Sequence, residues 1–382
     1  MSPIITGQIS DALPPILDGV AHVVVNYDSV LNAHYGTCFK LGPYVQNSPD
    51  VISDNDIRCR SIPIPKARPY RLMLPRLDAE FTKRIQNIPF DIVHSHSPFV
   101  SGKIGLSISR RQNIPMVTTL HSKYRDDFLR YFPNEKLVDA AVHHLVKFYQ
   151  KVDQVWVPNA STGGTLREYG YKGDFEIMPN GVDLIPPADG ENSTLKERAR
   201  KLAGIGEDRK VLLFVGQHTW KKNIRRIIGS LEILKEKRNG FIMLFAGEGP
   251  DIKKIKELVE QSGLTNHVKF LGKLSVREQL RSLYAVADLF FFPSRYDNDP
   301  LVVKEAAACR LPSVLLTASN AAQGIQDGEN GFLVSDDERD IAAKIDSILD
   351  NDTLSQACGR GSVWYALQVM GIDCRRGVRT LH

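Results

Sequence analysis

The chain has 382 residues, of which 42% are hydrophobic and 24% are charged, and this length predicts about two domains with sizeable cores. The formal net charge of +5 is too small an excess of basic residues to argue for nucleic-acid binding. The five cysteines are scattered and include no CxxC pair, so neither a disulfide framework nor a zinc site is expected.

No basic-then-apolar leader precedes Ile4, and no run of about 18 apolar residues occurs in the sequence. We therefore expect neither a signal peptide nor a membrane-spanning helix. The cysteine usage favours a reduced, cytoplasmic protein. Peripheral attachment at the inner face of a membrane is compatible with this expectation.

The first expected strand covers residues 4–9, and an amphipathic helix from Val20 to Leu31 follows the turn at Asp18-Gly19-Val20. A glycine at a strand-to-helix turn lets the backbone approach a phosphate, and the helix N-terminus favours the anion. A glycine required only by the turn explains the same residue equally well. Gly19 is therefore a candidate phosphate-binding residue, and both interpretations stay open.

A basic, proline-rich stretch spans residues 58–84 and includes the apolar run from Leu72 to Leu74. Its basic residues are Arg58, Arg60, Lys66, Arg68, Arg71, Arg76, Lys83 and Arg84. Such a stretch is suited to contact an anionic lipid surface or an anionic acceptor. A solvated loop that leads into a helix explains it too, because charge runs usually have that role.

Histidines follow two expected buried strands of the first half. His94 and His96 lie where a strand passes into a loop, and His121 follows the strand from Pro115 to Leu120. Residues at i and i+2 of a strand point the same way. A metal site would need a third ligand with matching geometry, and no signature supplies one. We therefore expect structural or hydrogen-bonding histidines.

A long amphipathic helix is expected after Pro133-Asn134. Its predicted core face consists of Leu137, Val138, Ala141, Leu145 and Phe148. A strand at 153–157, a short helix at 162–169 and a strand at 175–178 complete the first half.

In the second half, strands are expected at 211–215, 241–246 and 268–271, and helices at 224–237, 252–261 and 276–284. Two successive runs of βα units predict an α/β protein with two facing, doubly wound, Rossmann-like domains and a ligand cleft between them. The expected division is a first domain at 1–183, a linker region at 184–209, a second domain at 210–350 and a tail of uncertain structure at 351–382.

The segment from Ala287 to Leu316 contains the strongest candidate site. An apolar run ends at Pro293, a polar loop with Asp297 follows, and a helix is expected to begin at Leu301. Such a loop lies outside the carboxyl end of a strand, where open α/β sheets bind ligands. Glu305 then lies about one turn into the helix, while the backbone amides of Leu301 and Val302 point towards the loop. This combination suits a ligand with hydroxyls beside a phosphate.

Other motifs are absent or weak. No GxGxxG follows the first strand of either half, which disfavours a dinucleotide-binding dehydrogenase, and no GxxxxGK[ST] is present to support a P-loop phosphotransferase. Asp54-x-Asp56 and Asp297-x-Asp299 match a short acidic pattern that holds a divalent metal on a nucleotide sugar. A tripeptide is weak evidence, and no metal ligands are assigned.

The stretch PSRYDNDPLVVKEAAACRLPSV resembles the signature of the family-four retaining glycosyltransferases of the GT-B fold (group 1 glycosyltransferases). Further stretches resemble family motifs: Asp18-Gly19-Val20, His94–Phe99, Thr119–Ser122, Pro179–Asp183, Gly216–Lys222 and Gly247–Pro250. The histidine motifs are most similar to the bacterial lipid and cell-envelope branch. The resemblance covers nearly the whole chain and implies an acceptor-side first domain and a nucleotide-sugar-binding second domain.

The resemblance also implies roles for individual residues. Glu305 would hydrogen-bond the nucleotide ribose, and Asp297 would contact sugar hydroxyls. Lys222 would neutralise the diphosphate, and His121 would lie beside the transferred sugar. Gly19 would let the backbone approach the diphosphate, and Leu301 and Val302 would offer backbone amides. Donor-binding positions are also implied for Gly216, Gln217 and Gly247, which lie in the donor loops of the second domain. The catalytic residues would thus be His121, Asp297 and Lys222, with no metal ion or further cofactor beyond the donor.

Three features depart from the family pattern. Asp297 is shorter than the usual glutamate, so its sugar contacts are expected to shift. Gln217 stands where the family usually has an arginine, which leaves more of the phosphate charge to Lys222, with Lys221 as a candidate for compensation. Residues 359–382 do not read clearly as the helix with which the family pattern ends.

The resemblance implies transfer of a hexose, with retention, from a nucleotide diphosphate sugar such as UDP-glucose to a lipid or glycan hydroxyl. The expected partners are this donor, the acceptor and an anionic membrane surface, without nucleic acid. Two alternatives stay open. A nucleotide-sugar epimerase would release an altered sugar without an acceptor, and a non-catalytic sugar-nucleotide-binding protein would bind UDP without turnover.

Overall fold

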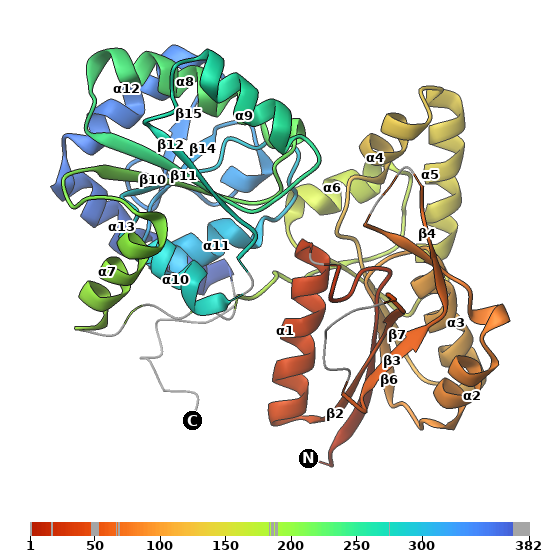
Figure 1. Ribbon diagram of the computed structural model, residues 1–382. Coiled ribbons are helices and arrows are strands. Elements are labelled where there is room, and N and C mark those ends of the chain that lie inside the picture. Colours follow the sequence, from red (N-terminus) through yellow and green to blue (C-terminus); the bar gives the residue numbers. More distant parts are fainter. Residues whose placement is uncertain are drawn as a thin grey trace. The chain divides into compact units, whose positions relative to one another are not determined.

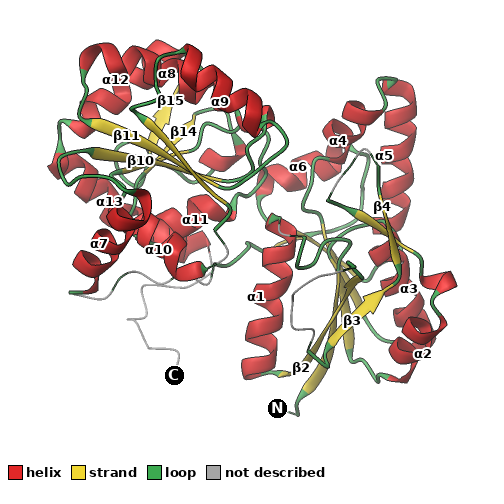
Figure 2. Ribbon diagram, viewed as in Figure 1, coloured by secondary structure: helices red, strands yellow, loops and turns green. Residues whose placement is uncertain are grey.

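The chain forms two compact units, Met1–Asn180 and Gly181–His382 (Figure 1). The computed structural model describes residues 2–369 apart from 17, 47–52, 66, 68, 183, 185, 186, 188, 189 and 275. Each unit is built around one parallel sheet with helices on both faces (Figure 2).

The first unit contains a seven-stranded sheet in the order β3-β2-β1-β6-β7-β8-β9, with all neighbours parallel. Its strands are β1 (Ile4–Ile9), β2 (Gly36–Pro43), β3 (Asp56–Cys59), β6 (Ile92–Ser95), β7 (Met116–Thr119), β8 (Gln154–Val157) and β9 (Glu176–Ile177). Its helices are α1 (Gly19–His34), α2 (Ala79–Asn87), α3 (Val100–Gln112), α4 (Tyr124–Tyr131), α5 (Glu135–Tyr149) and α6 (Ala160–Glu168). The strand order reverses between β1 and β6, so the loops after these two strands flank one crevice at the carboxyl edge.

A small antiparallel hairpin, β4 (Ser61–Pro63) with β5 (Arg71–Met73), lies apart from the main sheet and precedes a 3₁₀ turn, η1 (Pro75–Leu77). It falls within the basic stretch 58–84, for which the sequence left a solvated loop as one interpretation. Ile62 and Leu72 are directly paired across the two strands and both are exposed.

The second unit contains a six-stranded parallel sheet in the order β12-β11-β10-β13-β14-β15. Its strands are β10 (Lys210–Val215), β11 (Phe241–Ala246), β12 (Val268–Gly272), β13 (Leu289–Phe291), β14 (Ser313–Leu316) and β15 (Phe332–Val334). Its helices are α7 (Glu191–Ala203), α8 (Ile224–Lys237), α9 (Ile252–Gln261), α10 (Arg277–Val286), α11 (Leu301–Ala308), α12 (Glu338–Leu349) and α13 (Asp352–Val369), with 3₁₀ turns η2 (Trp220–Lys222) and η3 (Asn320–Ala322). Helices α8, α9 and α12 cover one face, and α7, α10, α11 and α13 cover the other (Figure 2). This is the doubly wound order, with its switch point between β10 and β13.

The predicted strands and helices that surround the candidate site are present with small shifts at their ends. The predicted core face of α5 was wrong in part: Val138, Leu145 and Phe148 are buried, whereas Leu137 is 63% exposed and Ala141 is also exposed. Val142 and Val146 are buried instead, so the buried face is rotated from the predicted one. The cause is tertiary packing on the sheet, which selects one face of a helix with apolar residues on several sides.

Two helices lie in the segments predicted as a linker region and as a tail of uncertain structure. Helix α7 falls within the region 184–209 and buries Leu195, Ala199 and Ala203 in the second unit. Helix α13 contains Gly359 and Gly361, at which an added Cβ would lie 2.3 Å from the Arg310 carbonyl oxygen and 2.1 Å from that of Glu329. Glycines usually indicate a break in a helix, but here they allow close backbone approach.

The connection from α11 to β14 places Arg310 in the left-handed region, with φ of 61°. Its amide donates to the Ala307 carbonyl at 3.0 Å, and the Leu311 amide donates to that of Ala306 at 2.9 Å. These two bonds form a Schellman motif, in which glycine is the usual residue at the left-handed position.

We predict that Arg310→Gly stabilises the second unit by about 0.5–1 kcal/mol, because the backbone strain of a side chain at this φ is relieved. Arg310→Ala is the matched control, since it removes the same side chain and keeps the strain. Urea denaturation should show a higher midpoint for the glycine variant than for the alanine variant. Equal midpoints would contradict the strain argument.

Candidate functional site

The carboxyl edge of the second sheet holds two glycine-containing loops in direct backbone contact. The chain leaves β10 through Gly216 and leaves β11 through Gly247, and a Cβ on Gly247 would lie 2.1 Å from the Gly216 carbonyl oxygen. Both residues have positive φ, 154° and 131°. A Cβ on Gly249 would likewise lie 2.4 Å from the His218 carbonyl oxygen. These glycines therefore let the loops after β10 and β11 meet backbone to backbone, the first of them at the switch point, and Gln217 is exposed on that first loop.

Lys222 and Asp297 meet across this switch point. Lys222 ends η2 in the loop after β10, Asp297 lies in the loop after β13, and their side chains form an ion pair. The Ser294 hydroxyl donates to the other oxygen of Asp297, and the Lys222 ammonium lies 5.4 Å from the centre of the Phe292 ring. Asn223 follows with φ of 60° and lets the chain turn from η2 into α8. Two residues predicted from the sequence are thus brought together.

Glu305 is buried in α11 and already bonded on both carboxylate oxygens. Oε1 accepts from the Arg277 guanidinium at 2.9 Å, and Oε2 accepts from the Tyr284 hydroxyl at 2.9 Å. Burial, and then the negative charge of Glu305, raise the pKa of Tyr284 well above its usual value, so this hydroxyl stays a donor. An ionised carboxylate has about four acceptor positions, so two further hydrogen bonds can be accepted from ligand hydroxyls. Sequence reasoning missed both partners, which only the packing of α10 against α11 brings into range.

A second lysine–aspartate pair joins the loop to α11. Lys304 is 1% exposed, and its ammonium lies 2.6 Å from Asp299 Oδ2. Burial lowers the pKa of Lys304, and the charge of Asp299 opposes that shift. The pair was not recognised from the sequence, although a lysine within an otherwise apolar helical pattern is a usable signal. Asp297 and Asp299 are each bonded to a lysine in this arrangement.

The first turn of α11 contributes backbone donors to the same loop. Pro300 is the N-cap residue of α11 and provides no side-chain hydrogen bond to the first turn. The amides of Leu301 and Val302 are among the first four N–H groups of the helix, which have no acceptor within the helix. The partial positive charge of a helix N-terminus adds to that of Lys222.

In the first unit, the predicted histidines form one buried group. The rings of His94 and His96 lie side by side, with centres 4.0 Å apart and planes tilted by 38°, which confirms that they point the same way. A nitrogen of His121 lies 3.1 Å from a nitrogen of His96. Burial lowers the pKa of His94 to about 3 and that of His121 to about 4. The described residues contain no group of three potential ligands arranged to hold a metal ion. These histidines are therefore neutral hydrogen-bonding groups at neutral pH.

Gly19 begins α1, and the preceding Asp18 caps the helix by accepting from the Ala21 amide at 2.8 Å. Asp18 also accepts from the Tyr70 hydroxyl at 2.9 Å, and burial raises its pKa. A Cβ on Gly19 would meet nothing within 4 Å. The fold of the first unit therefore does not itself require a glycine here, and a phosphate-binding role stays a prediction.

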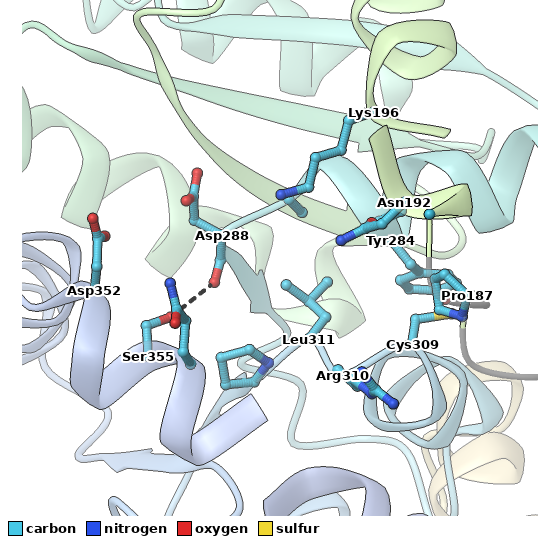
Figure 3. Close-up of a pocket in the computed structure, with 15 residues that line it drawn as sticks. Pro187, Asn192, Lys196, Tyr284, Asp288, Cys309, Arg310, Leu311, Asp352 and Ser355 are labelled. Atoms are coloured by element: carbon cyan, nitrogen blue, oxygen red, sulfur yellow. Dashed lines mark hydrogen bonds between the residues drawn. The ribbon is translucent and has the colours of Figure 1, made fainter. Parts of the chain in front are cut away.

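A cavity of about 370 Å³ lies elsewhere in the second unit (Figure 3). Its wall includes Asp288, which precedes β13, and Pro312, which precedes β14, so it opens at the amino edge of the sheet. Lys196 and Asp352 line the same cavity. It is separate from the loops that carry Lys222 and Asp297, and none of the predicted site residues lines it.

Comparison with known proteins identifies the family. Residues 196–362 match the family described as "Glycosyl transferases group 1", and residues 38–185 match "Glycosyltransferase Family 4". Among curated proteins, the chain is 25% identical to an alpha-monoglucosyldiacylglycerol synthase of Acholeplasma laidlawii over 96% of this chain and 95% of that protein. A protein of the same name from Streptococcus pneumoniae is 28% identical over 62% of this chain and 53% of that protein.

Solved structures show the same fold. A sucrose-phosphate synthase from Thermosynechococcus elongatus superimposes with a TM-score of 0.78 at 20% identity and covers 96% of this chain and 95% of that one. Anabaena HepE in complex with UDP-glucose gives a TM-score of 0.75 at 17% identity over 97% of both chains. These structures are GT-B enzymes, and the chain belongs to the group 1, family-four glycosyltransferases of the GT-B fold.

Proposed function

We propose that this protein transfers a hexose from a nucleotide diphosphate sugar, with UDP as the nucleotide, to a hydroxyl of a membrane lipid or glycan. The observation that carries the proposal is the Lys222–Asp297 ion pair at the switch point. Glu305, which accepts a hydrogen bond on each carboxylate oxygen, lies in α11, the helix that follows the loop with Asp297. The donor class is supported by Anabaena HepE, whose structure is a complex with UDP-glucose. The acceptor class is supported by the relative named alpha-monoglucosyldiacylglycerol synthase.

The proposed mechanism is electrostatic. As the bond from the sugar to the diphosphate breaks, negative charge grows on the leaving group, and Lys222 with the amides of Leu301 and Val302 stabilises it. Because Asp297 and Asp299 are already bonded to lysines, we propose that Lys222 and these amides, and not a divalent ion held by the two carboxylates, neutralise the diphosphate. Glu305 accepts from the ribose hydroxyls, and His121 contacts the transferred sugar. Retention at the anomeric carbon is part of the proposal because the family resemblance implies it.

The membrane-lipid acceptor is supported by the β4–β5 hairpin. Ile62 and Leu72 are 49% and 41% exposed and form a cross-strand pair, and Leu77 beyond them is 66% exposed. Arg60 and Arg76 are exposed in the same segment, whereas Arg58 is bonded to Asp56 and the Pro14 carbonyl. Lys66 and Arg68 lie outside the described residues. Apolar side chains among arginines suit the surface of an anionic bilayer. Within the described part of the chain, no helix has the length and apolar character needed to span a membrane.

The two alternatives make different predictions. Nothing in the described site favours the epimerase. A non-catalytic protein that binds sugar nucleotides would show the binding effects below without transfer to any acceptor, so binding and turnover must be measured together.

We predict that Lys222→Met weakens UDP binding by about tenfold or more, since one charge-assisted contact to a diphosphate is lost. Lys237→Met is the matched control, because Lys237 is an exposed lysine at the last residue of α8 and has no assigned role in the site. Asp297→Asn should bind UDP at least as tightly as the parent, because it frees Lys222, while its turnover falls. Calorimetric titration with UDP measures all three variants. Equal losses in both lysine variants would contradict the assignment of Lys222.

We predict that Glu305→Gln reduces the preference for UDP over 2′-deoxy-UDP, because the ribose hydroxyl loses a charged acceptor. The parent should bind UDP about tenfold more tightly than the deoxy form, and the variant should bind the two within about threefold. A variant that lost affinity for both ligands by the same factor would show that Glu305 acts through the fold alone.

We predict that the double variant Ile62→Gln/Leu72→Gln binds anionic vesicles several-fold more weakly than the parent, because two inserting side chains are lost. Ile177→Gln is the matched control, since Ile177 is a 51% exposed isoleucine of the same unit. Flotation with phosphatidylglycerol vesicles measures the bound fraction. If the parent protein fails to float, contact with an anionic lipid surface is excluded for this hairpin.

A further inference from the structure

Asp336 lies in the loop after β15 and binds three side chains from other parts of the carboxyl edge of the second sheet. Its Oδ1 atom accepts from Asn223 Nδ2 at 3.2 Å and from Arg226 Nε at 3.0 Å. Its Oδ2 atom forms an ion pair with Arg295. Asn223 is the N-cap residue of α8, Arg226 lies in the first turn of that helix, and Arg295 lies in the loop after β13. One carboxylate, with its three partners the Asp336 clamp, therefore joins the segments that follow β10, β13 and β15.

The side-chain amide of Asn223 strengthens the same connection. Its nitrogen Nδ2 carries two hydrogens, and it donates to the Pro293 carbonyl at 3.2 Å as well as to Asp336. Asn223 has φ of 60°, a left-handed conformation that asparagine and glycine adopt more readily than other residues. The residue therefore turns the chain directly after Lys222 and also ties that turn to the two neighbouring loops.

The clamp joins the same two loops as the Lys222–Asp297 ion pair, but a ligand affects the two connections differently. A diphosphate beside Lys222 offers the ammonium a new partner and brings negative charge against Asp297, which weakens the ion pair. Asn223 directly follows Lys222, and Arg295 lies two residues before Asp297. The bonds to Asp336 therefore hold chain neighbours of the ion pair and can persist while the pair itself opens.

We propose that Asp336 is a positioning residue that keeps the loops after β10 and β13 together while a diphosphate replaces Asp297 as the partner of Lys222. The inference rests on the proposed function, in which Lys222 binds that diphosphate. Asp336 acts through its partners and not by contact with the donor. Loops that are held in place before binding lose less conformational entropy when the ligand arrives, so the clamp raises the affinity for UDP.

Hydrogen–deuterium exchange of the full-length protein without ligand, measured by mass spectrometry, tests the clamp itself. Asp336→Ala should speed exchange several-fold in the peptides that contain Lys222 and Asp297, because the connection between their loops is lost. Asn223→Gly is a second variant that suits the φ of 60° and removes the bridging amide. It should fold and should speed exchange in the same two peptides.

Asp346→Ala is the matched control for these variants. The Asp346 side chain is 24% exposed, compared with 17% for Asp336, and it pairs with Arg238, the C-cap residue at the opposite end of α8. This variant loses an aspartate–arginine ion pair of similar burial and should leave exchange in both loops unchanged. Unchanged exchange in Asn223→Gly, or equal effects of Asp336→Ala and Asp346→Ala, would overturn the proposal.

Calorimetric titration with UDP tests the link to Lys222. If the clamp and the Lys222–Asp297 pair hold the same two loops, the effect of removing one depends on the presence of the other. Asp336→Ala should weaken UDP binding by about threefold in the parent and by about tenfold or more in the Asp297→Asn background. Equal factors in the two backgrounds would overturn the proposal. A parent protein that binds no UDP would overturn the proposed function and the change of partner at Lys222 with it, while the deuterium data would still decide whether Asp336 holds the loops.

Discussion

Two lysine–aspartate pairs fix the loop between β13 and α11, and the whole donor-binding proposal depends on where that loop lies. One pair, Lys222–Asp297, crosses the switch point of the sheet, and the other, Lys304–Asp299, ties the loop to the helix that follows. A lysine that is 1% exposed keeps its charge only with a partner. Removal of one member of a buried pair such as Lys304–Asp299 typically costs about 3–5 kcal/mol, so the attachment of the loop to α11 is strongly determined.

The Lys222–Asp297 pair explains how a site with an aspartate at this position can bind a diphosphate. In the proposed mechanism, Asp297 neutralises Lys222 until the donor arrives, and the diphosphate then replaces the carboxylate as its partner. The aspartate is one methylene shorter than the glutamate usual in the family and reaches Lys222 directly. Glu305 keeps its orientation independently of this exchange, because Arg277 and Tyr284 hold its two oxygens.

Much of the architecture follows from sequence patterns, since buried parallel strands are short apolar runs and the helices between them are periodic. The loops that hold Lys222 and Asp297, and the helix with Glu305 that follows the second loop, were predicted because strand ends can be counted along the chain. Arg277 and Tyr284 were not predicted, because their contact with Glu305 depends on how α10 packs against α11. Leu137 was assigned to the core because it is apolar, although packing selects a neighbouring face of α5. The buried histidine group was foreseen only as hydrogen-bonding side chains, since the pairing of β6 with β7 sets the approach of His121 to His96.

The most direct test of the account is the product formed from UDP-[¹³C]glucose by the purified full-length protein. The reaction would contain diacylglycerol in anionic mixed micelles or cell-envelope glycans as acceptors, with and without a chelator of divalent cations, and mass spectrometry would identify the product. The proposed function predicts labelled glucose in a new glycosidic bond to one of these acceptors, at a rate that the chelator leaves unchanged. UDP binding without transfer to any acceptor, or transfer that requires an added divalent cation, would contradict it.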